Sequence, residues 1–186
     1  PTAAFAKQHL NSRWGKLETY VVLSIRPECA GYILLGFQRP PKPEEWERIV
    51  LEQDMAAMHA CFDRVPVKPG EVWLVPGGLP HAIGEGVLML EVMEPSDLVV
   101  RCEFEREGIV VPPPARFMGR DPRFAMKIFD YTPLTVDAVR QRCQVTPATT
   151  QRGSGFASSE ELIGPQQTSC FTIARFAAKQ RAELAS

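Results

Sequence analysis

The 186-residue sequence lacks the features that mark several large classes of protein. Its 21 basic and 22 acidic residues leave a net charge of −1 with no basic run, whereas surfaces for nucleic acid or anionic lipid need an excess of positive charge. No apolar stretch approaches the ~18 to 20 residues of a membrane-spanning helix, and the first residues lack the basic-then-apolar order of a signal peptide. We therefore expect a cytoplasmic protein that binds a small molecule or another protein, and neither nucleic acid nor a membrane; the oligomeric state stays open.

Cysteine and histidine are also scarce. The five cysteines form an odd set without C-x-x-C spacing, and Cys102 and Cys170 lie within apolar, strand-like runs, so we expect reduced core thiols and not disulfides. Only three histidines are present, His9, His59 and His81. The length predicts one domain or two small ones, which bury roughly two-thirds of the unfolded chain's surface without needing a metal or a disulfide to fold.

The first half of the chain combines a short helix, strands and a helical insertion. Residues 2–10 are rich in alanine, with apolar residues at helical spacing. Residues 16–25 and 30–37 have strand patterns, and we expect them to pair as an antiparallel hairpin. Residues 44–63 carry an apolar helical stripe that is predicted to break near Gln53.

Short strands separated by glycine or proline turns follow from residue 65 to residue 104. Such regular spacing is typical of a small barrel or sandwich. The last predicted strand, residues 97–105, alternates between polar and apolar positions and places Asp97 and Arg101 on one face. At a separation of four residues they lie about 13 Å apart on an ideal strand. A mutual salt bridge is therefore not expected, and a solvated edge is the simpler alternative to a functional pair.

The composition changes after residue 108, where a triple-proline connector opens a second, β-rich part of the chain. We expect two helices, a loop, two strands and a fraying tail, in the order 122–128, 136–144, 146–159, 161–163, 169–176 and 179–186.

His81 and Glu18 are the residues most suited to chemistry. His81 follows a Gly-Gly-Leu-Pro turn, and taken alone it could equally be a functional side chain or a turn histidine that caps a strand. Glu18 is a carboxylate on an apolar strand with Lys16 on the same face, and such groups are costly to bury unless they are paired or coordinated. A His and a Glu on two barrel strands can hold a divalent cation, but tight sites take three or four protein ligands. The sequence offers no third ligand at a clear spacing.

Three stretches resemble a known family. VPGGLPHAIGEGVLMLEVMEPSDLVVR resembles the signature region of the class I mannose-6-phosphate isomerases, which are zinc-dependent cupins. WGKLETYVVL resembles the Gly-Lys-x-Glu strand of that family, and ELIGPQQTSCFTIARF is similar to the strand that closes its chains. The linked motifs, in the family's order, cover most of the sequence.

The resemblance implies a role for five side chains. Glu18 and His81 are the expected ligands of Zn²⁺ or another divalent metal. Lys16, Asp97 and Arg101 match family residues for substrate handling and proton transfer, with Lys16 and Arg101 contacting the sugar phosphate. Which of Lys16 and Asp97 is acid and which is base stays open.

The same resemblance points to residues outside this sequence. In the family, two further ligands come from a Gln-x-His-Pro motif before an alanine-rich helix, and Pro1 resembles the proline of that motif. The Gln and the His are therefore expected immediately before it. Residues 93–96 and the pair Val99 and Val100 depart from the more polar sequence of many family members, which suggests a drier pocket wall or a different sugar.

Together these patterns predict an all-β protein. Residues 1–108 are expected to form a cupin double-stranded β-helix (jelly roll) with a helical insertion at about 44–63, followed by a smaller β-rich unit over 109–186 that could be a second, degenerate cupin. The implied function is a metal-dependent aldose-ketose isomerase that interconverts mannose 6-phosphate and fructose 6-phosphate through an enediol. The alternative is a non-catalytic sugar-binding or regulatory cupin without a complete metal site. An iron-dependent cupin oxidoreductase is disfavoured, because such sites cluster histidines.

Overall fold

The computed structural model describes residues 1–150 and 154–183. The chain divides into two compact units, Pro1–Cys143 and Gln144–Ser186. The division therefore lies C-terminal to the boundary that the sequence suggested after residue 108.

The segments that follow residue 108 pack against the first unit, which explains the later division. Phe117 and Met126 are buried in the same apolar cluster as Trp46. Val139 is buried in a second cluster beside Tyr20. Because these side chains complete the core of the first unit, the segments that carry them belong to it.

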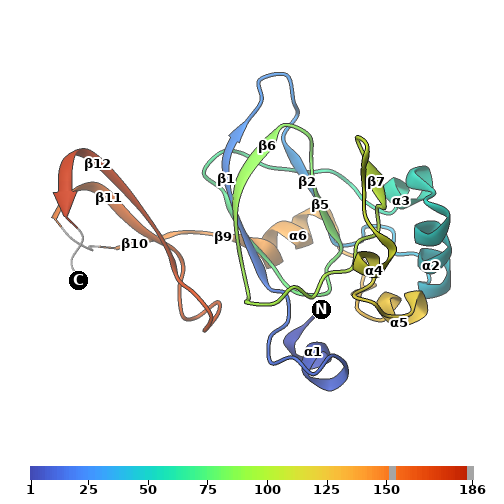
Figure 1. Ribbon diagram of the computed structural model, residues 1–186. Coiled ribbons are helices and arrows are strands. Elements are labelled where there is room, and N and C mark those ends of the chain that lie inside the picture. The colour runs from blue at the N-terminus through green and yellow to red at the C-terminus, as the bar shows by residue number, and fades with distance from the viewer. Residues whose placement is uncertain (151–153, 184–186) are drawn as a thin grey trace. The chain divides into compact units, whose positions relative to one another are not determined.

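The first unit contains short strands with helices gathered beside them (Figure 1). In chain order its elements are α1 (Ala3–His9), β1 (Glu18–Ile25), β2 (Tyr32–Leu35), α2 (Pro43–Glu52), α3 (Met55–Ala60), β3 (Val65–Pro66), β4 (Val72–Val75), β5 (His81–Ile83), β6 (Val87–Met93), β7 (Glu105–Arg106), β8 (Ile109–Val110), α4 (Pro113–Arg116), α5 (Pro122–Met126) and α6 (Val136–Cys143).

Two antiparallel sheets share the core of this unit. β1 pairs with β4 on one side and with β6 on the other, whereas β2 pairs with β3 and β5. The predicted hairpin between residues 16–25 and 30–37 is therefore wrong, because these strands belong to different sheets. The apolar faces of the two sheets meet in one cluster that includes Val22 of β1, Leu35 of β2 and Trp73 of β4. β1 and β2 are therefore in contact through buried side chains and not through backbone hydrogen bonds.

The helical insertion packs with neighbouring segments in the apolar cluster that contains Trp46. α2 begins at Pro43 with two glutamates in its first turn, an arrangement that suits a helix N-terminus. It ends at Gln53, which has a left-handed backbone (φ 53°), and Asp54 then caps α3 by accepting a hydrogen bond from the backbone N–H of Ala57. The predicted break near Gln53 is confirmed.

The predicted strand at residues 97–105 does not form, apart from its last residue, Glu105, which begins β7. Its backbone groups find partners other than a neighbouring strand. The backbone N–H of Arg101 donates to the carbonyl oxygen of Arg116 (2.8 Å). The side-chain amide of Gln53 donates to the carbonyl oxygen of Cys102 (2.8 Å) and accepts from the backbone N–H of Phe104 (2.7 Å). This segment, residues 97–104, is called the pocket loop below.

The predicted helices at 122–128 and 136–144 are confirmed as α5 and α6. The five cysteines are free thiols; Cys61 and Cys143 are buried as the prediction of core thiols requires, whereas Cys29, Cys102 and Cys170 are only half-buried. None of the helices in the described part of the chain is long and apolar enough to cross a bilayer.

The second unit begins with β9 (Gln144–Val145) and contains an antiparallel sheet of β10 (Ala148–Thr149), β11 (Ser154–Ile163) and β12 (Ile173–Glu183). The loop predicted over 146–159 is thus partly wrong, since its residues 148–149 and 154–159 are strand; residues 151–153 lie outside the described part. The tail predicted to fray from residue 179 belongs to β12 as far as Glu183, and residues 184–186 lie outside the described part.

Candidate functional site

Two glycines bring separate segments of the chain against the backbone of Pro1. A Cβ atom at Gly77 would lie 2.0 Å from the carbonyl oxygen of Pro1, and one at Gly15 would lie 2.7 Å from the same oxygen. That oxygen also accepts a hydrogen bond of 2.8 Å from the backbone N–H of Lys16. The segment that leads into β1 and the turn that leads into β5 are therefore fixed on one short piece of backbone.

This packing brings Glu18 and His81 together. The Nε2 atom of His81 lies 3.0 Å from the Oε2 atom of Glu18. Its Nδ1 atom lies 2.8 Å from the carbonyl oxygen of Leu79, which it contacts within the turn. The side chain of Glu18 is only 6% exposed and that of His81 is 29% exposed. The carboxylate is thus buried behind an imidazole that reaches the surface.

Tyr20 is a third member of this cluster. It is 4% exposed, and its hydroxyl donates a hydrogen bond of 2.5 Å to the Oε2 atom of Glu18. Its ring meets the ring of His81 edge-on, with 5.9 Å between the centroids. Tyr20 follows Glu18 by two residues on β1, so strand alternation places both on the same face.

The three groups shift one another's ionisation. Burial alone would raise the pKa of Glu18, but its hydrogen bonds with His81 and Tyr20 hold that pKa below the ordinary value. Burial alone would lower the pKa of His81, but the neighbouring carboxylate holds it above the ordinary value. Burial, followed by the charge of Glu18, raises the pKa of Tyr20 well above its usual range. The tyrosine therefore stays a hydrogen-bond donor.

Lys16 lies beside this cluster and is held by the turn after β6. Its Nζ atom contacts the Sδ atom of Met93 (2.7 Å) and donates to the carbonyl oxygen of Ser96 (3.2 Å). The hydroxyl of Ser96 donates in turn to the carbonyl oxygen of Gly15. Met93 and Ser96, at the two ends of the Met-Glu-Pro-Ser sequence, thus position the lysine.

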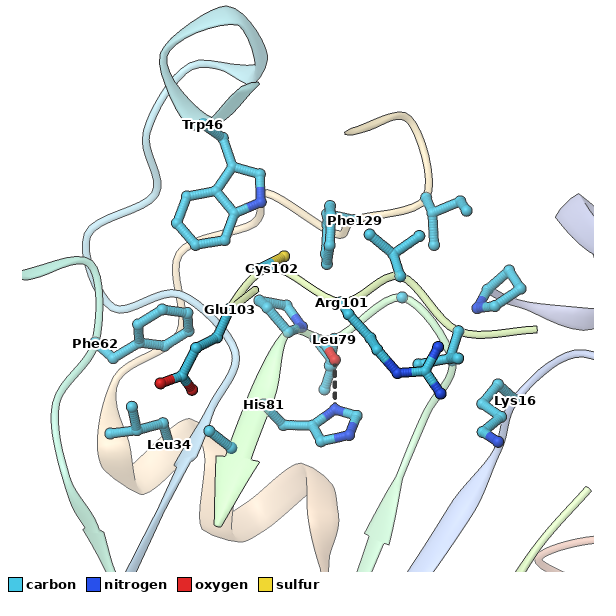
Figure 2. A pocket seen from close by; sticks show the side chains of 18 of the residues that line it. Lys16, Leu34, Trp46, Phe62, Leu79, His81, Arg101, Cys102, Glu103 and Phe129 are labelled. Carbon is cyan, nitrogen blue, oxygen red and sulfur yellow. Dashed lines mark hydrogen bonds between the residues drawn. The ribbon is translucent and has the colours of Figure 1, made fainter. Parts of the chain in front are cut away.

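A pocket of about 360 Å³ opens over these residues. Figure 2 shows Lys16, His81 and Arg101 at one end of it, with the guanidinium of Arg101 directed toward the other two. Trp46 and Phe62 are drawn at the other end. Glu18 also lines this pocket, so four of the five side chains singled out from the sequence converge.

Asp97 is the exception among those five. It is exposed and is not among the residues that line the pocket, whereas the residues that follow it, 98–103, all line it. Because the pocket loop is not a strand, successive residues are free to face the pocket. Arg101 is held there by a hydrogen bond from Nη1 to the carbonyl oxygen of Ala115 (2.8 Å). Val99 and Val100 contribute apolar wall.

Sequence reasoning missed the roles of Tyr20 and Glu91. Glu91 lies opposite Tyr20 across the β1–β6 pairing, so it stands on the same face of the sheet as Glu18. Partial burial, followed by the charge of Glu18, raises its pKa. Alternation along residues 87–93 was a signal for Glu91, but only the strand register shows which residue it faces.

The chain is similar to known proteins over about half of its length. No protein-family profile matches the chain. Over 108 residues, which are 58% of the chain, it is 31% identical to mannose-6-phosphate isomerase ManA of Bacillus subtilis and 32% identical to the mannose-6-phosphate isomerase of Streptococcus mutans. This stretch of the chain is similar in sequence to the mannose-6-phosphate isomerases. The matched stretch covers 32% of each of these relatives, so the chain spans about a third of their length.

The fold is similar to that of a solved structure. The structure resembles the crystal structure of the mannose 6-phosphate isomerase from Bacillus subtilis with a TM-score of 0.62, over 95% of this chain and 49% of that one, at 18% identity. The strand-rich antiparallel architecture expected from the sequence is thereby confirmed.

Proposed function

We propose that this chain carries the substrate pocket of a metal-dependent aldose-ketose isomerase that interconverts mannose 6-phosphate and fructose 6-phosphate. The observation that carries the proposal is the convergence of Glu18, His81, Lys16 and Arg101 on one pocket in a relative of these isomerases. A cupin jelly roll is the proposed form of the antiparallel strands that hold the site.

Glu18 and His81 have the chemistry that a divalent metal requires. With Nδ1 of His81 directed at a backbone carbonyl, Nε2 carries the lone pair that could bind a metal in the neutral ring, and this is the arrangement that metal-binding histidines usually show. Two donors on one tetrahedral zinc would stand about 3.4 Å apart, given Zn–N and Zn–O distances near 2.1 Å. The observed separation of 3.0 Å is close to that.

Zn²⁺ or another divalent ion held there would polarise the oxygens on C1 and C2 of the sugar and lower the barrier to proton transfer. Arg101 supplies a fixed positive charge at the same end of the pocket and would bind the anionic phosphate or a developing enediolate oxygen. Lys16 would orient the sugar and move the proton between C1 and C2. Its place in the pocket favours it over Asp97 for that step.

A non-catalytic sugar-binding or regulatory protein is the second candidate. Among residues 1–150 and 154–183, no group of three or more His, Cys, Asp or Glu side chains could hold a metal ion. A pocket with two donors binds a metal weakly unless further ligands join them. Such a pocket could still bind a sugar through Lys16 and Arg101.

Metal analysis together with an isomerase assay separates the two candidates. The protein is expressed from the complete reading frame and its bound metal is quantified. Conversion of mannose 6-phosphate to fructose 6-phosphate is then measured with and without a chelator. We expect about one divalent ion for each site and a turnover that chelation abolishes and added metal restores. His81→Ala should lose both metal and turnover, and His9→Ala serves as its matched control because His9 lies on α1 and does not line the pocket.

Solvent exchange tests the proton-transfer step. In deuterated water, an enediol route introduces deuterium at C2 of mannose 6-phosphate, because the migrating proton exchanges on the enzyme.

Full-length protein that binds no metal and gives no turnover would refute the isomerase and leave the sugar-binding candidate.

A further inference from the structure

We propose that Tyr20 is a positioning residue that fixes both Glu18 and His81 for metal binding. This inference rests on the proposed metal-dependent function. It goes beyond that function by naming a residue that touches neither metal nor substrate in the proposed scheme. It also explains why a tyrosine hydroxyl is buried in an otherwise apolar core.

The contacts of Tyr20 carry the proposal. Its hydroxyl donates to the Oε2 atom of Glu18 at 2.5 Å, and its ring packs edge-on against the ring of His81. One side chain thus contacts both proposed ligands. A carboxylate with no such donor could rotate about its side-chain bonds, whereas a carboxylate held at one oxygen keeps the orientation that faces His81.

Tyr20 is itself held rigidly. It is 4% exposed and lies in the core cluster with Val22, Leu35 and Trp73. Aromatic rings in such cores are confined to well-defined rotamers, so the hydroxyl is a fixed point and not a mobile donor. The core thus holds Tyr20 in place, and Tyr20 in turn holds Glu18 and His81.

The charge balance of the cluster is consistent with this role. Glu18 is a buried carboxylate whose nearest partners are an imidazole and a hydroxyl. Metal binding occupies the imidazole nitrogen that contacts the carboxylate in this structure. The Tyr20 hydroxyl would then be the partner that still holds Glu18, because its bond does not depend on the protonation of His81.

Tyr20→Phe removes the hydroxyl and keeps the ring. We expect Co²⁺ and Zn²⁺ to bind about 10- to 100-fold more weakly, which is the usual effect of removing the hydrogen-bond partner of a metal ligand. The absorption spectrum of bound Co²⁺, which reports the geometry of its ligands, should also change. Tyr131→Phe is the matched control: its hydroxyl donates to the carbonyl oxygen of Met126 at 3.0 Å, in the other apolar cluster.

The measurement uses the protein from the complete reading frame, with metal affinities from chelator competition and the fold checked by circular dichroism. Weaker Co²⁺ binding in Tyr20→Phe, with wild-type binding in Tyr131→Phe, supports the inference. Equal affinity and an unchanged Co²⁺ spectrum in Tyr20→Phe overturn it. Wild-type protein that binds no Co²⁺ overturns the role of Tyr20 and the metal centre together. Protein that binds Co²⁺ but does not isomerise mannose 6-phosphate overturns the proposed function alone.

Discussion

Replacing Gly77 by alanine tests whether backbone packing sets the geometry of the site. The added methyl group would lie 2.0 Å from the carbonyl oxygen and 2.6 Å from the carbonyl carbon of Pro1. Both are backbone atoms, so no side-chain rotation can relieve the contact. Either the Pro1 segment or the turn before His81 has to move by on the order of 1 Å to restore van der Waals separation.

Two magnitudes follow from that displacement. Overpacking of a close contact costs about 1 to 3 kcal/mol of unfolding free energy. The same movement changes the distance between His81 and Glu18, and loss of support for a metal ligand weakens metal binding by about 10- to 100-fold. We expect both effects in Gly77→Ala, measured by urea unfolding and by chelator competition with Co²⁺.

Gly119→Ala provides the control. Gly119 has φ 67°, but a Cβ atom there would meet nothing within 4 Å. This variant should therefore lose about 1 to 2 kcal/mol from backbone strain alone and keep wild-type metal affinity. Gly15→Ala should combine less than additively with Gly77→Ala, because both displace the same oxygen of Pro1. Gly77→Ala with wild-type metal affinity would refute the reasoning.

Three further predictions concern stability. Gln53→Ala leaves two backbone groups of the pocket loop without their side-chain partner and should cost about 1 to 3 kcal/mol for each group that stays unsatisfied, with faster hydrogen exchange in that loop. Burial alone would raise the pKa of Asp130, but hydrogen bonds and the charge of Arg142 hold it below the ordinary value. The stabilisation is therefore present above the unfolded-state pKa and lost as pH falls through the folded-state pKa. Asp130→Asn should be about 1 kcal/mol less stable than wild type at pH 7 and equal to it in acid, by urea unfolding. Leu35→Ala, at a position that is 0% exposed, should lose about 2 to 5 kcal/mol, seen as a lower urea midpoint.

Local sequence patterns predicted those parts of the site in which neighbouring residues decide the backbone conformation. Alternation predicted that Glu18 and Lys16 share one face of a strand; β1 begins at Glu18, and Lys16 lies just before it. The glycine-rich turn pointed to His81, which is the first residue of β5. The helix break at Gln53 was visible because polar residues interrupt the apolar stripe. In each case the residues that decide the conformation are neighbours in the sequence.

Long-range partners explain what the sequence did not show. The pocket loop alternates like a strand, but Gln53 and Arg116 provide the hydrogen bonds that a neighbouring strand would have made. Asp97 consequently does not line the pocket with Arg101. β1 and β2 follow one another along the chain but lie in separate sheets. Their apolar faces pack into one cluster instead, and neighbouring residues in the sequence do not show this packing.

The hydrogen bonds of Gln53 join the helical insertion to the pocket loop, and Trp46 of α2 and Met58 of α3 line the pocket itself. We therefore expect the insertion to respond to what the pocket contains. A ligand that holds the loop in place also holds the residue that ends α2. A ligand that stabilises the loop then also raises the free energy that is needed to open the helices locally. Ligand binding should therefore slow amide exchange throughout α2 and α3, including turns on the outer side of the helices that no ligand could reach.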